Sequence, residues 1–214
     1  MATQTQSPVE NRFLLRDVDW DTYEKLRAIP ANWRLHMTYD RGELEIMSPS
    51  KRHELLKGLI GRLIEIFALE LNIPIQTTGS TTWKDRALEQ GLEADESYYI
   101  QNEAIVRDRS EFDPETDPPP DLAVEVEITS SALPRMNLYA ALGVREVWRY
   151  DGERLHVHIL TAEGNYEESD RSLNLPLLQP NEVERFLRRR QGVDETTWSR
   201  AFQQWVREQF VGQE

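Results

Sequence analysis

The residues best suited to chemistry are acids on one short apolar segment. Residues 121–128 have the sequence DLAVEVEI, in which the two-residue period of a strand puts Asp121, Glu125 and Glu127 on one face and the aliphatic side chains on the other. Clustered carboxylates repel one another, so one must take up a proton unless a cation neutralises them. Oxygen ligands without cysteine suit a hard ion, Mg²⁺ or Mn²⁺. The alternative is a solvated face of an acidic protein.

A further acid, Asp95, precedes the aromatic residues Tyr98 and Tyr99 in another segment with strand character. If that strand pairs beside the first, Asp95 and Glu125 converge, because same-face neighbours on paired strands lie about 5 Å apart. The sequence does not specify this pairing. Convergence of the two acids is therefore a hypothesis that the tertiary structure tests.

The elements that must position these acids are a mixture of strands and helices. Apolar residues recur at helical spacing from Leu55 to Leu71, which predicts an amphipathic helix, and alternation around Asp40-Arg41-Gly42 predicts a β-hairpin. We expect other strands at 75–84, 93–100, 122–129, 146–150 and 155–160, and other helices through Tyr23 and Leu26, at 131–142, from Asn181 and from Glu195. This order predicts one α/β domain at 11–214, a mixed sheet flanked by helices, after a disordered tail at 1–10.

The composition of the 214 residues favours a folded protein of a reducing compartment. Hydrophobic residues make up 39% and charged residues 29%, and the absence of cysteine excludes disulfides, thiolate zinc sites and a cysteine nucleophile. No signal peptide or membrane span is visible, so we expect a soluble cytoplasmic protein with no membrane partner. The net charge of −13 opposes attraction to nucleic acid unless a local basic patch exists.

Five groups of motifs spread along the chain carry a family resemblance. They are Ser48-Pro49-Ser50 with His53-Glu54, Gly79-Ser80-Thr81-Thr82, Gly91-Leu92-Glu93-Ala94-Asp95-Glu96, Pro118-Pro119-Pro120-Asp121-Leu122 with Val124-Glu125-Val126, and Tyr139-Ala140-Ala141-Leu142-Gly143-Val144 with Glu146-Val147-Trp148. With these motifs the chain resembles the Uma family, a domain of unknown function abundant in cyanobacteria and assigned to the PD-(D/E)XK nuclease superfamily. The resemblance implies a restriction-endonuclease-like core, here with an N-terminal β-hairpin and C-terminal helices.

The resemblance also implies a metal-dependent endonuclease that hydrolyses nucleic acid, with DNA as the first substrate to consider. Asp95 looks like the superfamily's first acid, although Ala94 stands where proline usually precedes it. Glu125 looks like the second acid. Both would ligate Mg²⁺ or Mn²⁺.

The chain departs from the superfamily pattern at Glu127, which stands where those nucleases carry a lysine that positions or activates the attacking water. The missing cation could come from Arg135, at a position that is often lysine in the family and on the same helical face as Tyr139. Arginine stabilises charge but hardly accepts a proton. Lys84 is a weaker substitute and Lys57 weaker still.

Three further residues are candidates for an accessory role. Asp121 is either a ligand or a turn residue after proline, and the turn is slightly favoured. His53 and Glu54 near the start of the long helix either complete the site or are ordinary helix-start residues. His156 and His158 lie far from the acids in sequence, so we expect them to be structural or solvent-facing.

Two other functions compatible with the same residues remain open. Glu127 and the charge of −13 favour a catalytically degenerate interaction module, and the acids would also suit hydrolysis of another phosphoester or a nucleotide. A homodimer is a further hypothesis, because a stripe of aromatic residues near the C-terminus could form an interface, although such a stripe more often joins the core. The stripe consists of Trp198, Phe202, Trp205 and Phe210.

Overall fold

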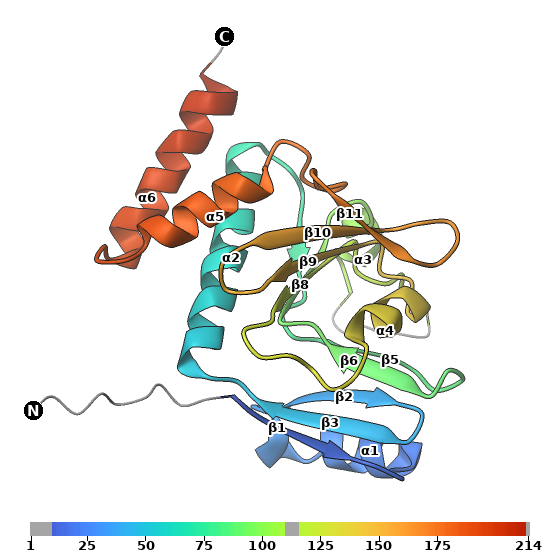
Figure 1. Cartoon of the computed structure of the whole chain (residues 1–214). Coiled ribbons are helices and arrows are strands. Elements are labelled where there is room, and N and C mark those ends of the chain that lie inside the picture. Colours follow the sequence, from blue (N-terminus) through green and yellow to red (C-terminus); the bar gives the residue numbers. More distant parts are fainter. Residues whose placement is uncertain (1–9, 110–115, 213–214) are drawn as a thin grey trace, which may run out of the picture.

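Two β-sheets, with helices packed on them, form the computed structural model of the protein (Figure 1). The structure describes residues 10–109 and 116–212, so residues 1–9 of the predicted tail at 1–10 and residues 110–115 of the proline-rich loop lie outside the described residues. The α/β class is confirmed, but the single expected sheet is divided into two. Within the described ranges, no helix combines the length and apolar character that a membrane crossing requires.

The first sheet has five antiparallel strands in the order β1-β3-β2-β6-β5. They are β1 (Asn11–Leu15), β2 (His36–Asp40), β3 (Glu43–Ser48), β5 (Thr82–Asp85) and β6 (Gln90–Glu93). The predicted hairpin is confirmed as β2 and β3, and the positive φ angles of Arg41 and Gly42 suit its two-residue turn. Helix α1 (Trp20–Arg27), followed by a 3₁₀ turn at Pro30–Asn32, packs on the face that carries Tyr39. His36 and Thr38 therefore face the opposite way.

The second sheet has six strands in the order β11-β10-β9-β8-β7-β4. They are β4 (Gln76–Thr77), β7 (Glu96–Tyr99), β8 (Leu122–Val126), β9 (Glu146–Tyr150), β10 (Leu155–Leu160) and β11 (Tyr166–Ser169). Strands β8 and β9 are parallel, and the crossover between them contains helix α4 (Arg135–Ala141). Strand β7 is followed by the short helix α3 (Glu103–Val106).

The long predicted helix is confirmed as α2 (Lys51–Glu70). Its buried residues pack against Leu122, Val124 and Val126 of β8. Helix α5 (Pro180–Arg189) packs on α2 and β10, and α6 (Glu195–Val206), which continues into a π-helical turn, Arg207–Val211, packs on α2 and α5. Figure 1 shows α5 and α6 beside α2, away from the first sheet. The C-terminal aromatic stripe packs on this core within the chain, so the core interpretation is confirmed for it.

The predictions of single strands at 75–84 and 93–100 are wrong. Residues 76–77 and 96–99 belong to the second sheet, whereas 82–85 and 90–93 belong to the first. Gly79, with φ of +55°, lies where the first segment changes sheet, and Ala94 and Asp95 span the second change. The periodic pattern alone did not show these breaks, because both halves of each segment are extended.

Two differences near the chain's acids bear on the site. The helix predicted at 131–142 begins only at Arg135, since Ser131 and the backbone N–H of Ala132 donate to the buried carboxylate of Glu45 on β3. Glu10, expected in the tail, is instead buried, and its carboxylate accepts a hydrogen bond from Thr129. The loop that follows β8 is thus held against the first sheet.

Candidate active site

Asp95 and Glu125 lie opposite each other on adjacent strands. Pairing of Glu96 with Val124 continues by one residue to place Asp95 beside Glu125, and Asp95 N–H donates to the Val124 carbonyl at 3.1 Å. The predicted pairing is therefore confirmed. Both acids are buried, 1% and 8% exposed, so the alternative of a solvated acid face is wrong for them.

The carboxylate of Asp95 is surrounded by nitrogen atoms. Its Oδ2 accepts the Val126 N–H at 2.6 Å and lies 3.0 Å from His53 Nε2, while its Oδ1 lies 3.4 Å from His36 Nδ1. The two imidazole contacts are close but not aligned as hydrogen bonds. Burial acts to raise the pKa of Asp95, but the two histidines and the Val126 N–H outweigh it and lower the pKa below the ordinary value.

The two histidines differ in charge at neutral pH. Burial opposes protonation of His53, but its contacts with Asp95 and Glu54 prevail and raise its pKa to about 10. Burial lowers the pKa of His36 to about 4, against the attraction of Asp95. His53 is thus the cation beside Asp95, and it is fixed there because its backbone N–H is capped by the Ser50 side chain at the start of α2.

Glu125 has its own cation. Arg135 Nη2 lies 2.5 Å from Glu125 Oε1, to which the Tyr139 hydroxyl also donates. The same guanidinium donates to Thr38 Oγ1 and to the backbone carbonyl of Glu93, which ties α4 to the first sheet. Burial, together with the charge of Asp95, raises the pKa of Glu125 despite these donors.

These contacts correct the physical argument made from sequence. A bound metal ion is not the only source of charge that makes ionisation of both acids tolerable, because His53 and Arg135 each supply a positive charge. The compensation is incomplete for Glu125, whose pKa remains raised. An additional cation would therefore still stabilise its ionised form.

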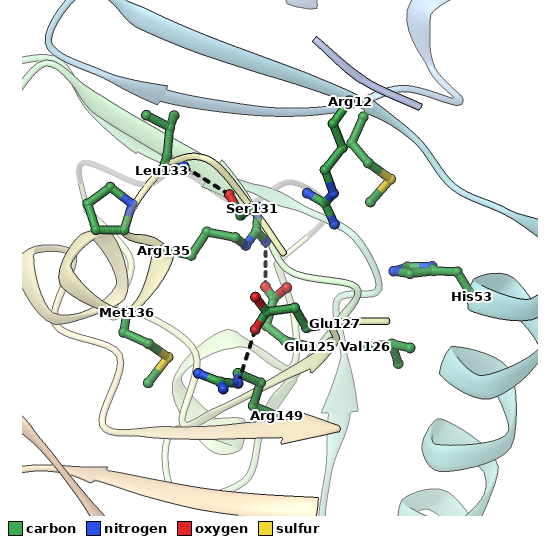
Figure 2. Close-up of a pocket in the computed structure, with 12 residues that line it drawn as sticks. Arg12, His53, Glu125, Val126, Glu127, Ser131, Leu133, Arg135, Met136 and Arg149 are labelled. Carbon is green, nitrogen blue, oxygen red and sulfur yellow. Dashed lines mark hydrogen bonds and ion pairs between the residues drawn. The ribbon is translucent and has the colours of Figure 1, made fainter. Parts of the chain in front are cut away.

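Glu125 and Glu127 border a cavity of about 190 Å³ between the two sheets and α4, whereas Asp95 is not among the residues that line it. Figure 2 shows Glu125 and Glu127 side by side in it, with Arg135 and Arg149 reaching them from opposite sides. Glu127 Oε2 lies 3.0 Å from Arg149 Nε. Arg12 and His53 line the same cavity, so three arginines surround the acids in a protein of strongly negative net charge.

Several predicted residues lie outside this cavity. Asp121 accepts hydrogen bonds from the backbone N–H groups of Ile100 and Asn102 and from the Asn102 side chain, as expected of a turn residue. Lys84 forms an ion pair with Glu24 on α1.

Two further candidates lie closer to the acids. Glu54, on the side of α2 that is half-exposed, is 3.5 Å from His53 Nδ1. The charge of Lys57 acts on His36 and Glu96 next to Asp95, but neither Lys57 nor Lys84 lines the cavity. His156 and His158 lie on β10 and are absent from the cavity lining, as expected.

The sequence reasoning missed His36, Thr38, Arg12 and Arg149. No local sequence pattern identifies the first three, because they belong to the first sheet and come near the site only through tertiary packing: His36 lies beside Asp95, Thr38 accepts from Arg135, and Arg12 lines the cavity. Tyr139 could have been found, because it lies one helical turn after Arg135 and shares its face.

The sequence profile of the Uma2 family, described as "Putative restriction endonuclease", matches residues 20–190. The chain belongs to the Uma2 family. The expected resemblance is thereby confirmed, and the two sheets and six helices of the described residues are consistent with a restriction-endonuclease-like fold. A search of curated proteins finds no match to this Uma2 chain.

A divalent metal is implied by the superfamily, and the donor atoms of this Uma2 chain fit one. Among the described residues, no group of three or more histidine and acidic side chains is arranged to hold a metal ion. Asp95 and Glu125 nevertheless lie on adjacent strands, the charge of Asp95 acts on Glu125, and Glu125 Oε2 accepts no hydrogen bond from any described residue. Two carboxylates suit Mg²⁺, which usually keeps several water ligands.

Proposed function

We propose that this Uma2 protein is an endonuclease that hydrolyses phosphodiester bonds of nucleic acid, DNA in the first place, with Mg²⁺ or Mn²⁺ as cofactor. The observation that carries the proposal is the pair of buried carboxylates, Asp95 and Glu125, on adjacent strands, of which Glu125 lines a cavity that also contains arginines. The absence of cysteine supports a reducing compartment, the cytoplasm, as the place where it acts.

Asp95 and Glu125 would hold the metal ion. When bound, it supplies an activated water and stabilises charge on the phosphoryl oxygens. His53 holds the Asp95 carboxylate in its ionised form, since its imidazolium lies 3.0 Å away. Arg135 fixes Glu125 and keeps its positive charge, because the pKa of this guanidinium is raised by Glu125, in opposition to burial.

The overall charge of −13 is offset locally. Arg12, Arg135 and Arg149 all border the cavity, so a phosphate entering it meets positive charge. Among the described residues that line the cavity, none is a lysine, and arginine is a poor base. The water would therefore be activated without a lysine in the position that the superfamily uses.

The test is incubation of the purified protein with plasmid DNA and Mg²⁺ or Mn²⁺. We expect nicking or linearisation that Glu125→Ala abolishes. Glu163→Ala, which removes one charge from an exposed turn, is the matched control and should cleave as the wild type does. No cleavage by the wild type, or equal cleavage by Glu125→Ala, would contradict the proposal.

A second candidate function is a catalytically degenerate interaction module. It is favoured by the partners that each acid already has, His53 for Asp95 and Arg135 for Glu125, and by Glu127 in the lysine position. Calorimetric titration with Mn²⁺ separates the two functions. Binding that Asp95→Ala abolishes supports the endonuclease, whereas no measurable heat of binding supports the degenerate module.

A further inference from the structure

Arg149 differs from the other arginines of the cavity in how few partners it has. It lies on β9 directly beside Glu125 in the parallel register and points to the same face of the sheet. Its side chain is 38% exposed, and its Nε is 3.0 Å from Glu127. In the described part of the chain, the Arg149 side chain donates no hydrogen bond, and Glu127 is the acid with which it forms an ion pair.

The other two guanidinium groups are committed to the protein. Arg135 donates to Glu125, to Thr38 and to the Glu93 carbonyl, and it is 14% exposed. Arg12 donates to Glu45 and Thr129 and is 15% exposed. Of the three arginines, Arg149 therefore has the guanidinium group that is available to bind an external ligand. A guanidinium group can bind phosphate by donating two parallel hydrogen bonds.

Glu127 is placed to compete with that ligand. Its backbone N–H donates to the Tyr150 carbonyl at 2.8 Å, which fixes its position at the end of β8. Its side chain is 28% exposed and that of Arg149 38%, so solvent reaches part of this ion pair. Exposed ion pairs contribute about 0–1 kcal/mol, which a phosphate with two charge-assisted hydrogen bonds can exceed.

We propose that Arg149 binds a phosphate of the nucleic-acid backbone next to the reacting one, and that Glu127 restrains this binding by occupying Arg149 until the strand enters. This assignment rests on the proposed function. It gives Glu127 a role in substrate affinity at the position where the superfamily has its lysine.

The experiment measures binding of a short fluorescein-labelled DNA duplex by anisotropy at several salt concentrations, with Ca²⁺ replacing Mg²⁺ and the duplex checked for integrity on a gel. Arg149→Ala should weaken binding about tenfold and reduce the slope of log affinity against log salt by about one. Glu127→Gln should strengthen binding about fivefold. In the double variant, the gain from Glu127→Gln should disappear.

Arg62→Ala is the matched control. Arg62 is an exposed arginine of α2 that lies outside the cavity and forms an ion pair with Glu195 of α6 at 2.8 Å. It should bind the duplex as the wild type does. Arg149→Lys, which keeps the charge, should preserve the salt slope while it weakens binding, and circular dichroism melting checks that each variant is folded.

Unchanged binding by a folded Arg149→Ala, or a gain from Glu127→Gln that persists without Arg149, overturns the assignment and leaves the endonuclease proposal standing. The second result would show that Glu127 acts only by general repulsion. If the wild type binds no duplex even at low salt, the proposed function itself fails and this assignment fails with it.

Discussion

Replacement of Arg135 by methionine should strongly destabilise the metal-free protein, because Glu125 then stays buried without its cation. The two side chains are 2.5 Å apart, and Glu125 is 8% exposed. Glu125 can avoid an uncompensated charge by taking up a proton, and burial already raises its pKa. The destabilisation should therefore depend on pH.

The size of the destabilisation by Arg135→Met follows from the free-energy cost of the proton that Glu125 must bind. Protonating a carboxyl group of ordinary pKa costs about 3.7 kcal/mol at about pH 7 and about 1 kcal/mol at about pH 5. The two bonds from Arg135 to Thr38 and to the Glu93 carbonyl add about 2 kcal/mol at either pH. The free energy of unfolding should fall by about 6 kcal/mol at the higher pH and about 3 kcal/mol at the lower. The loss grows with pH because the folded variant retains a proton that the unfolded chain releases.

Urea denaturation followed by tryptophan fluorescence, in EDTA at both pH values, measures this loss. The double variant Arg135→Met with Glu125→Gln should recover the pH-dependent part, since no buried charge remains. Arg149→Met, which breaks the exposed pair with Glu127, should cost less than about 1 kcal/mol. Equal losses at both pH values, or no recovery in the double variant, would show that Arg135 acts through packing and would refute the electrostatic reasoning.

Three further predictions concern residues around the site. Asp121→Ala should lower the free energy of unfolding by about 3 kcal/mol, because it removes the three hydrogen bonds from Ile100 and Asn102, and it should leave Mn²⁺ binding intact in calorimetry. Weakened binding would make Asp121 a ligand after all. Glu45→Gln should speed hydrogen exchange of the Ala132 amide about tenfold, and an unchanged rate would mean that this carboxylate does not anchor the loop. Burial raises the pKa of Glu96 to about 7, so the folded state holds a proton that the unfolded chain loses above its own pKa, and stability falls as pH rises through that window. Glu96→Gln should therefore stabilise the metal-free protein by about 2 kcal/mol at about pH 8, less than the full difference in pKa implies because the side chain is only partly buried, and have little effect at about pH 4, as urea denaturation would reveal.

Local pattern in the sequence was sufficient for much of the fold. Helical spacing of apolar residues predicted α2, the turn residues Arg41 and Gly42 predicted the hairpin, and β9 and β10 have the predicted bounds. Alternation along 122–126 also separated Glu125 from the valines that pack on α2. Each of these features depends on side chains a few residues apart, whose relative directions the backbone period fixes.

The tertiary structure decided what the acids contact. His53 reaches Asp95 across 42 positions of the chain, and Arg135 reaches Thr38 across 97, so neither contact follows from any local period. The change of sheet between Glu93 and Glu96 puts Asp95 at the junction where those partners meet. Strand order and register, which depend on the packing of the whole chain, therefore set the charge balance of the site, while the sequence alone set only which face of β8 carries its acid.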